Sequence, residues 1–115
     1  MLKLDWNYHR HSCTSCARTQ EFLTNHGIGT TQQVDARKQA IPPAEALALA
    51  RSVDHLYVIK AQKVVHYDLK NHPPSDDELL AAIVGRSGSL RAPAVRRGRT
   101  LIVGFDADTY RDVLA

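Results

Sequence analysis

Apolar and polar positions alternate at the start of the chain, and this alternation predicts a β-strand over Leu2–Tyr8 with one buried face. Residues 14–26 then carry apolar side chains at helical spacing, and Gly27 is suited to a helix C-terminus. A helix of about three turns is therefore expected there. A second, less apolar strand is predicted over 28–36. The chain thus begins with a β-α-β unit.

Proline pairs mark the next boundaries. Pro42-Pro43 precedes a segment rich in alanine and leucine, which predicts a helix over 44–51. After Pro73-Pro74, the sequence Ser75-Asp76-Asp77-Glu78 has the pattern of a capping box, so a third helix is expected over 79–84, ending near Gly85 or Gly88. Segment 55–69 has strand propensity but only short apolar runs, so it stays open between a hairpin and irregular helical turns.

Two short apolar runs near the C-terminus, 92–95 and 100–103, predict an antiparallel hairpin that turns at Gly98. Asp106 can cap a closing helix that runs through Tyr110 to Leu114. The order of elements predicts a mixed α/β fold, with a small sheet covered by helices. We expect a single domain over residues 1–115.

Composition narrows the class of protein. With 115 residues, 43% hydrophobic and 23% charged, the chain has an ordinary globular make-up. No apolar run is long enough to span a bilayer, and charges interrupt the first five residues, so we expect a cytoplasmic protein without membrane contact. The net charge of +3 favours no particular class of binding partner. Because 6% of the residues are aromatic and none interleaves the basic segments, direct nucleic-acid binding is not expected.

Both cysteines lie in one short stretch, Cys13-Thr14-Ser15-Cys16, at a predicted junction between strand and helix. A helix start offers unsatisfied N–H groups and the positive end of the helix dipole, which favour a thiolate. Cys13 is therefore the candidate nucleophile, and Cys16 is the candidate resolving thiol. Cationic neighbours that could lower the pKa of Cys13 are His9, Arg10, His11, Arg18 and Arg91.

Two alternatives to redox chemistry stay open for this stretch. The pair could be reduced and inert, or it could bind zinc, since four nitrogen and sulfur ligands fall within eight positions: His9, His11, Cys13 and Cys16. The scattered histidines at positions 26, 55, 66 and 72 are interpreted as structural. Arginines 86, 91, 96, 97 and 99 form the most biased charge run, and the last three are interpreted as a solvated hairpin tip.

Three motifs at their spacings resemble the ArsC/Spx family: His11-Ser12-Cys13-Thr14-Ser15-Cys16, Arg91-Ala92-Pro93, and Val103-Gly104-Phe105-Asp106. The resemblance covers nearly the whole chain. It implies a thioredoxin-like fold, with a helical insertion at about 43–88 between the second and third strands. It also implies that Pro93 is cis and faces Cys13, with Arg91 held near the sulfur and with His11 and Ser12 among the substrate-binding residues.

The resemblance also implies a chemistry. Arsenate reductases of this family use one cysteine, here Cys13, and three arginines that hold the oxyanion. Arg91 matches one of them, whereas Lys60 and Gly104 stand where the first and last are expected. Since two of the three arginines are missing, both the positive charge and the bidentate binding of the oxyanion are reduced. Efficient arsenate reduction is therefore not expected.

We therefore expect a monomeric thiol-disulfide oxidoreductase of this type, without a bound cofactor, whose electron donor is glutathione, glutaredoxin or thioredoxin. Cys13 and Cys16 would form its redox-active disulfide, with Lys60 and Pro93 beside the substrate. One alternative is a redox-switched regulator of the Spx kind, which binds the RNA polymerase α subunit. Another is a non-catalytic or zinc-binding scaffold.

Overall fold

A computed structural model describes residues 3–10, 14–61, 63–86 and 88–114 of the chain. Along the sequence these form β1 (Lys3–His9), α1 (Thr14–Asn25), β2 (Gly29–Asp35), α2 (Pro43–Arg51), β3 (His55–Lys60), β4 (Lys63–Asp68), α3 (Asp76–Ile83), β5 (Ala94–Arg97), β6 (Thr100–Val103) and α4 (Ala107–Leu114). None of the helices within those ranges is long and apolar enough to cross a bilayer.

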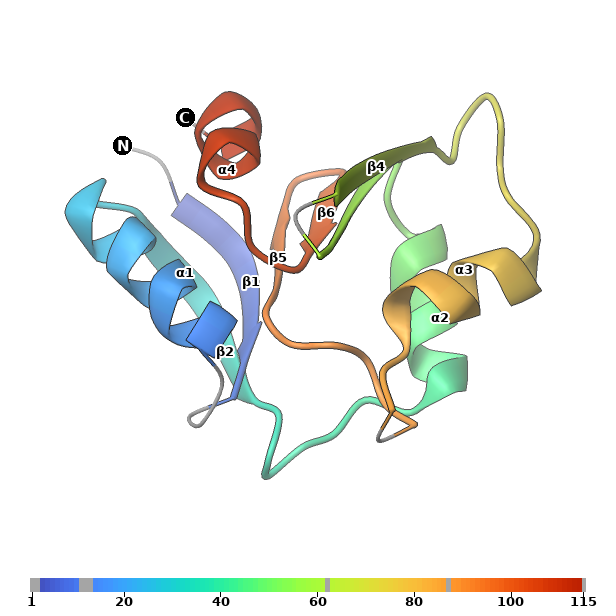
Figure 1. The fold of residues 1–115 in the computed structure, drawn as a ribbon, viewed down its shortest axis with the longest axis horizontal. Helices are drawn as coiled ribbons and strands as arrows, with labels where there is room; N and C mark the ends of the chain where they lie inside the picture. The colour runs from blue at the N-terminus through green and yellow to red at the C-terminus, as the bar shows by residue number, and fades with distance from the viewer. Residues whose placement is uncertain (1–2, 11–13, 62, 87, 115) are drawn as a thin grey trace.

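The six strands form one sheet in the order β2-β1-β5-β6-β3-β4. β1 runs parallel to β2, and β3 runs parallel to β6, while the other neighbours are antiparallel. Helices α1 and α4 lie on one side of the sheet, and α2 and α3 lie on the other (Figure 1). The predicted mixed α/β fold is therefore confirmed, with three layers.

Each face of the sheet has its own hydrophobic core. The core beneath α1 and α4 contains Leu4, Phe22, Ile102, Tyr110 and Leu114, among others. The opposite core beneath α2 and α3 is built from Tyr8, Ala46, Leu56, Leu79 and Ile83 with their neighbours. Burial on both faces explains why the central strands carry apolar residues in succession, as in Leu101, Ile102 and Val103.

Several local signals in the sequence act as predicted. Ser75 is the N-cap of α3, and its hydroxyl accepts the Glu78 N–H at 3.2 Å. Asp106 accepts the Thr109 N–H at 3.0 Å ahead of α4. Gly98 has a φ of 58° in the turn between β5 and β6, and Gly27 has a φ of 64° after α1.

Segment 55–69, which the sequence left open, forms the antiparallel hairpin β3–β4. Tertiary pairing decides this, because β3 also pairs with β6 and buries Leu56, Val58 and Ile59. The segment expected as a helical insertion at 43–88 therefore contains two helices and, in addition, two strands that extend the sheet.

Candidate functional site

A cleft of about 920 Å³ opens where β1 and β2 end, and the loop before β5 forms its other wall. Arg10 follows the last residue of β1, and Arg37 lies two residues after β2. Arg86 and Arg91 line the cleft from the segment between α3 and β5. No Asp or Glu stands among the described residues that line it. The cleft is therefore strongly electropositive.

The arginines of the cleft differ from other arginines of this chain. Arg51, Arg99 and Arg111 are each paired with an aspartate, at 2.6, 3.0 and 2.5 Å. In contrast, no ion pair within the described ranges involves Arg10, Arg37 or Arg86, and all three are exposed. Their charge is thus available to an anion that enters the cleft.

Cys16 lies in the first turn of α1, is 3% exposed, and accepts the backbone N–H of Arg10 at a distance of 3.3 Å from its Sγ. A smaller cavity of about 370 Å³ reaches this thiol and is lined by His9, Arg10, Ala17, Gln20 and Gln33 as well. Because Arg10 lines both the cavity and the cleft, the Cys16 thiol lies next to the electropositive cleft.

Three of the predicted site residues, His11, Ser12 and Cys13, lie outside the described residues. α1 begins at Thr14, the residue after Cys13. The position and the contacts of Cys13 itself stay a prediction.

Pro93 follows a cis peptide bond from Ala92, as the family resemblance implied. Its carbonyl accepts the Gly104 N–H at 2.8 Å, which ties the loop before β5 to the end of β6.

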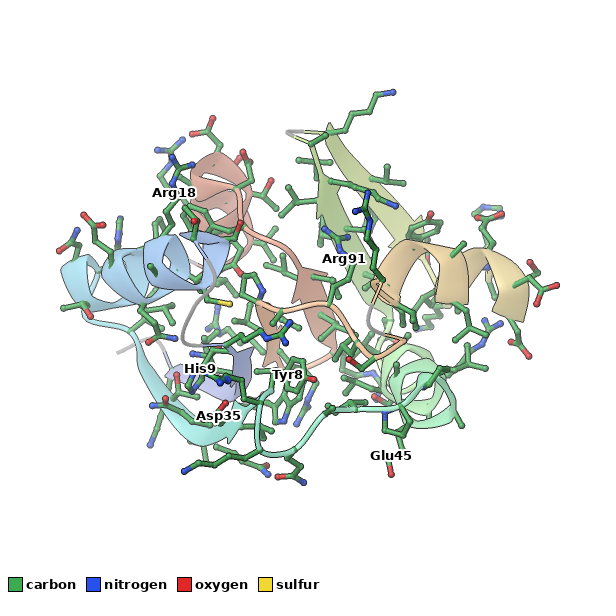
Figure 2. The ribbon with its side chains drawn as sticks, turned by 60° about the horizontal axis from the view of Figure 1, so that its bottom comes forward. Tyr8, His9, Arg18, Asp35, Glu45 and Arg91 are labelled. Carbon is green, nitrogen blue, oxygen red and sulfur yellow. The ribbon has the colours of Figure 1, made fainter. Side chains whose placement is uncertain are left out.

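Arg91 holds the loop before β5 to the rest of the chain. Its Nη2 donates to the Ile59 carbonyl at 2.9 Å, and its Nη1 donates to the Ala82 carbonyl at 3.3 Å. Ala82 is in the last turn of α3, where carbonyl groups lack helical partners. Burial lowers the pKa of the Arg91 guanidinium. Figure 2 shows Arg91 beside α3 and His9 near the start of α1. Arg91 thus lines the cleft, but two of its N–H groups are hydrogen-bonded to backbone carbonyls.

The two other positions of the expected arginine triad do not supply a cation to the cleft. Lys60 is exposed at the end of β3, opposite Lys63, and is not a lining residue. Gly104 has a φ of 105°, and a Cβ there would lie 2.6 Å from the Ile59 carbonyl oxygen and 2.9 Å from the Ile59 Cβ. The close approach of β3 therefore leaves no room for a side chain at position 104 unless the backbone shifts.

Sequence reasoning missed Arg37 and gave Arg10 only as a neighbour of Cys13. Both follow directly on the carboxyl ends of two adjacent parallel strands. Ligands in α/β folds bind beyond such ends, so strand order would have revealed them. Tyr8 also lines the cleft, and its hydroxyl accepts the Ile41 N–H at 3.2 Å.

A buried polar network lies beneath Cys16. The Thr19 hydroxyl donates to the Ser15 carbonyl at 2.8 Å, and the Tyr110 hydroxyl donates to the Gly104 carbonyl at 2.8 Å. Burial raises the pKa of Tyr110, a hydrogen bond with Thr19 opposes that rise, and negative charge on Cys16 adds to it. Tyr110 therefore stays protonated, and its hydroxyl donates to the Gly104 carbonyl.

The zinc alternative gains no support from the described residues, which contain no group of three or more histidine, cysteine, aspartate or glutamate side chains able to hold a metal ion. The four ligands considered in the sequence include His11 and Cys13, which fall outside those residues. The hairpin-tip arginines have intramolecular acceptors: Arg96 donates to Gly98, Arg97 to Leu114 and Arg99 to Asp54.

Comparison with known proteins agrees with this architecture. The ArsC family model matches residues 8–113, so the chain belongs to the ArsC family. A solved structure named as YffB protein shares the fold, with a TM-score of 0.58 and 13% sequence identity over 96% of this chain and 98% of that chain. No curated protein matches this sequence.

The family match and the shared architecture confirm the predicted thioredoxin-like fold of the ArsC type. Together with the cysteine pair, they support a thiol redox protein of this type.

Proposed function

We propose that this protein is a thiol-disulfide oxidoreductase that reduces disulfides carrying anionic groups, with Cys13 as nucleophile and Cys16 as resolving thiol. The observation that carries the proposal is the position of the Cys16 thiol, buried in the first turn of α1 and next to a cleft lined by arginines whose side chains form no ion pair with any described residue.

The reaction needs no cofactor. The Cys13 thiolate attacks one sulfur of the substrate disulfide, forms a mixed disulfide and releases the other sulfur as a thiol. The Cys16 thiolate then attacks the Cys13 sulfur and releases the second thiol, leaving a Cys13–Cys16 disulfide. Two equivalents of glutathione, or one reduced thioredoxin or glutaredoxin, return that disulfide to two thiols.

The environment of Cys16 suits a resolving thiol. At 3% exposure it is shielded from external reagents, yet it is three residues from Cys13. The N–H donated by Arg10 stabilises negative charge on Cys16 Sγ more than it stabilises the neutral thiol. Cys16 can therefore act as a thiolate once a partner is bound at Cys13.

The exposed arginines of the cleft favour an anionic substrate. A mixed disulfide of glutathione carries two carboxylates beside its sulfur, and Arg10, Arg37 and Arg86 offer planar donors for such groups. Oxyanion capture of the arsenate reductase kind is a weaker candidate, because position 104 admits no side chain and Lys60 does not line the cleft.

The test compares reduction of a glutathione mixed disulfide with reduction of the neutral hydroxyethyl disulfide and of arsenate. Cys13→Ser should abolish turnover, and Cys16→Ser should accumulate a mixed disulfide visible by mass spectrometry. Equal turnover in wild type and both variants would exclude the enzyme. A partner complex that changes with the Cys13–Cys16 disulfide, without turnover, would instead support the regulator.

Substrate charge is tested with Arg37→Gln and Arg86→Gln. Each should raise KM for the glutathione substrate several-fold and leave the neutral disulfide unchanged, because lost ionic hydrogen bonds affect only the charged ligand. Arg96→Gln removes the same charge at the hairpin between β5 and β6 and serves as the matched control. An equal effect of all three variants would refute recognition in the cleft.

A further inference from the structure

Two histidines that are eleven residues apart in the sequence meet on the hairpin β3–β4. His55 begins β3 and His66 lies in β4, and the register pairs Tyr57 with His66 and His55 with Asp68. His55 and His66 are therefore diagonal neighbours on one face of the sheet. His55 Nδ1 and His66 Nε2 are 3.0 Å apart, and both residues are exposed.

Packing limits the freedom of this pair. The two imidazole rings have centroids 5.2 Å apart and an interplanar angle of 25°. Tyr57 stacks on His66 with a centroid distance of 4.5 Å and an angle of 19°, and Tyr57 itself packs against the core beneath α1 and α4. One histidine ring is thus held by a half-buried aromatic side chain, which reduces the entropy lost when a ligand fixes it.

We propose that His55 and His66 form a binding site for a divalent transition metal ion, with Cu²⁺ as the preferred ion and water at the remaining positions. Nitrogen ligands at about 2.0–2.1 Å from a metal lie about 2.8–3.0 Å apart when they are at right angles, and about 3.3–3.4 Å apart in a tetrahedron. The observed 3.0 Å, a hydrogen-bond distance, shows that the two nitrogens can come as close as neighbouring ligands of one ion, and among the divalent ions of the first transition row Cu²⁺ binds such ligands most tightly.

Both inner nitrogens can coordinate only if the hydrogen that the rings share moves to an outer ring nitrogen. His55 then coordinates through Nδ1 with its proton on Nε2, and His66 coordinates through Nε2 with its proton on Nδ1. The lone pairs must turn toward a common point, and because Tyr57 holds the His66 ring, the adjustment is a rotation of the exposed His55 ring about χ2.

Two carboxylates lie close to the pair. Asp54 precedes His55, and Asp68 lies opposite it. Both carboxylates are held by other partners: Asp54 accepts two hydrogen bonds from Arg99, each at 3.0 Å, and Asp68 accepts from Lys70 and Asn71. These carboxylates are therefore engaged elsewhere and do not serve as ligands, and the Arg99 guanidinium offsets the charge of Asp54.

The site is tested by calorimetric titration of copper(II) chloride into full-length protein carrying Cys13→Ser and Cys16→Ser, which removes competing thiols. We expect one equivalent of Cu²⁺, with superhyperfine splitting from two nitrogens in the electron paramagnetic resonance spectrum. His66→Gln and His55→Gln should each weaken binding at least about tenfold, since a ligand is lost.

His72→Gln is the matched control, because His72 is exposed in the turn after β4 and lies outside the pair. It should bind Cu²⁺ like the parent. Equal affinity in the His55 and His66 variants and the parent, or a spectrum without two nitrogens, would overturn the proposal. Because the cysteines are absent, this outcome is independent of the proposed redox function.

Discussion

Replacing Gly104 with alanine tests the close approach of β3 and β6 that removes one expected arginine from the cleft. The added Cβ would lie 2.6 Å from the Ile59 carbonyl oxygen, a backbone atom that cannot move alone. A φ of 105° adds strain of about 1–2 kcal/mol for any residue with a Cβ. Overpacking in a filled core costs about 1–3 kcal/mol more.

We therefore expect Gly104→Ala to lower the free energy of unfolding by about 2–5 kcal/mol, measured by urea denaturation followed by circular dichroism. In a domain of this size each kcal/mol corresponds to roughly 4 °C in Tm. Gly98→Ala is the matched control, because Gly98 has a φ of 58° but nothing within 4 Å of its added Cβ. A loss for Gly104→Ala no larger than for Gly98→Ala would refute the steric argument.

Three further changes test other parts of the account. Arg91→Met removes the side-chain donor to the Ile59 and Ala82 carbonyls and should lower the free energy of unfolding in urea by about 1–3 kcal/mol. Arg86→Gln should change it by no more than about 0.5 kcal/mol. Equal losses in the two variants would contradict the role of Arg91 in holding the loop before β5. Ser75→Ala removes the cap of α3 and should cost about 1 kcal/mol, and Ser75→Asp should restore it. The hydrogen bond from Arg99 holds the pKa of the Asp54 carboxyl below its usual 3.8, so the stabilisation from this ion pair is present above pH 3.8 and is lost as the pH falls below it. Asp54→Asn should therefore reduce the acid-dependent loss of the urea midpoint. An unchanged pH profile of the urea midpoint in this variant would contradict the role of the pair.

Local signals explain how much of the fold the sequence could predict. Alternation identified β1, the serine at position 75 identified the start of α3, and Gly98 identified the final turn. The hairpin β3–β4 could not be decided in this way, because its identity depends on pairing with β6, which is distant in sequence. Local propensity carries no information about such a partner.

The candidate site was predictable only where chemistry is local. The cysteine pair and the loop containing Pro93 were visible in the sequence, whereas the carbonyl contacts of Arg91 and the closeness of Ile59 to Gly104 appear only in the folded chain. The same holds for the cleft arginines at positions 10, 37 and 86, which come from three separate segments. That these three side chains form no ion pair within the described ranges became clear only by comparison with the paired arginines elsewhere.

The most direct test of the proposed chemistry is the rate of alkylation of Cys13 by iodoacetamide as a function of pH, measured in the Cys16→Ser protein by mass spectrometry. If the start of α1 and the neighbouring arginines stabilise the thiolate, the rate should reach its plateau below the pH at which a free cysteine does, whose pKa is about 8.5. A titration that coincides with that of free cysteine, together with a wild-type protein that forms no Cys13–Cys16 disulfide under mild oxidation, would contradict the account.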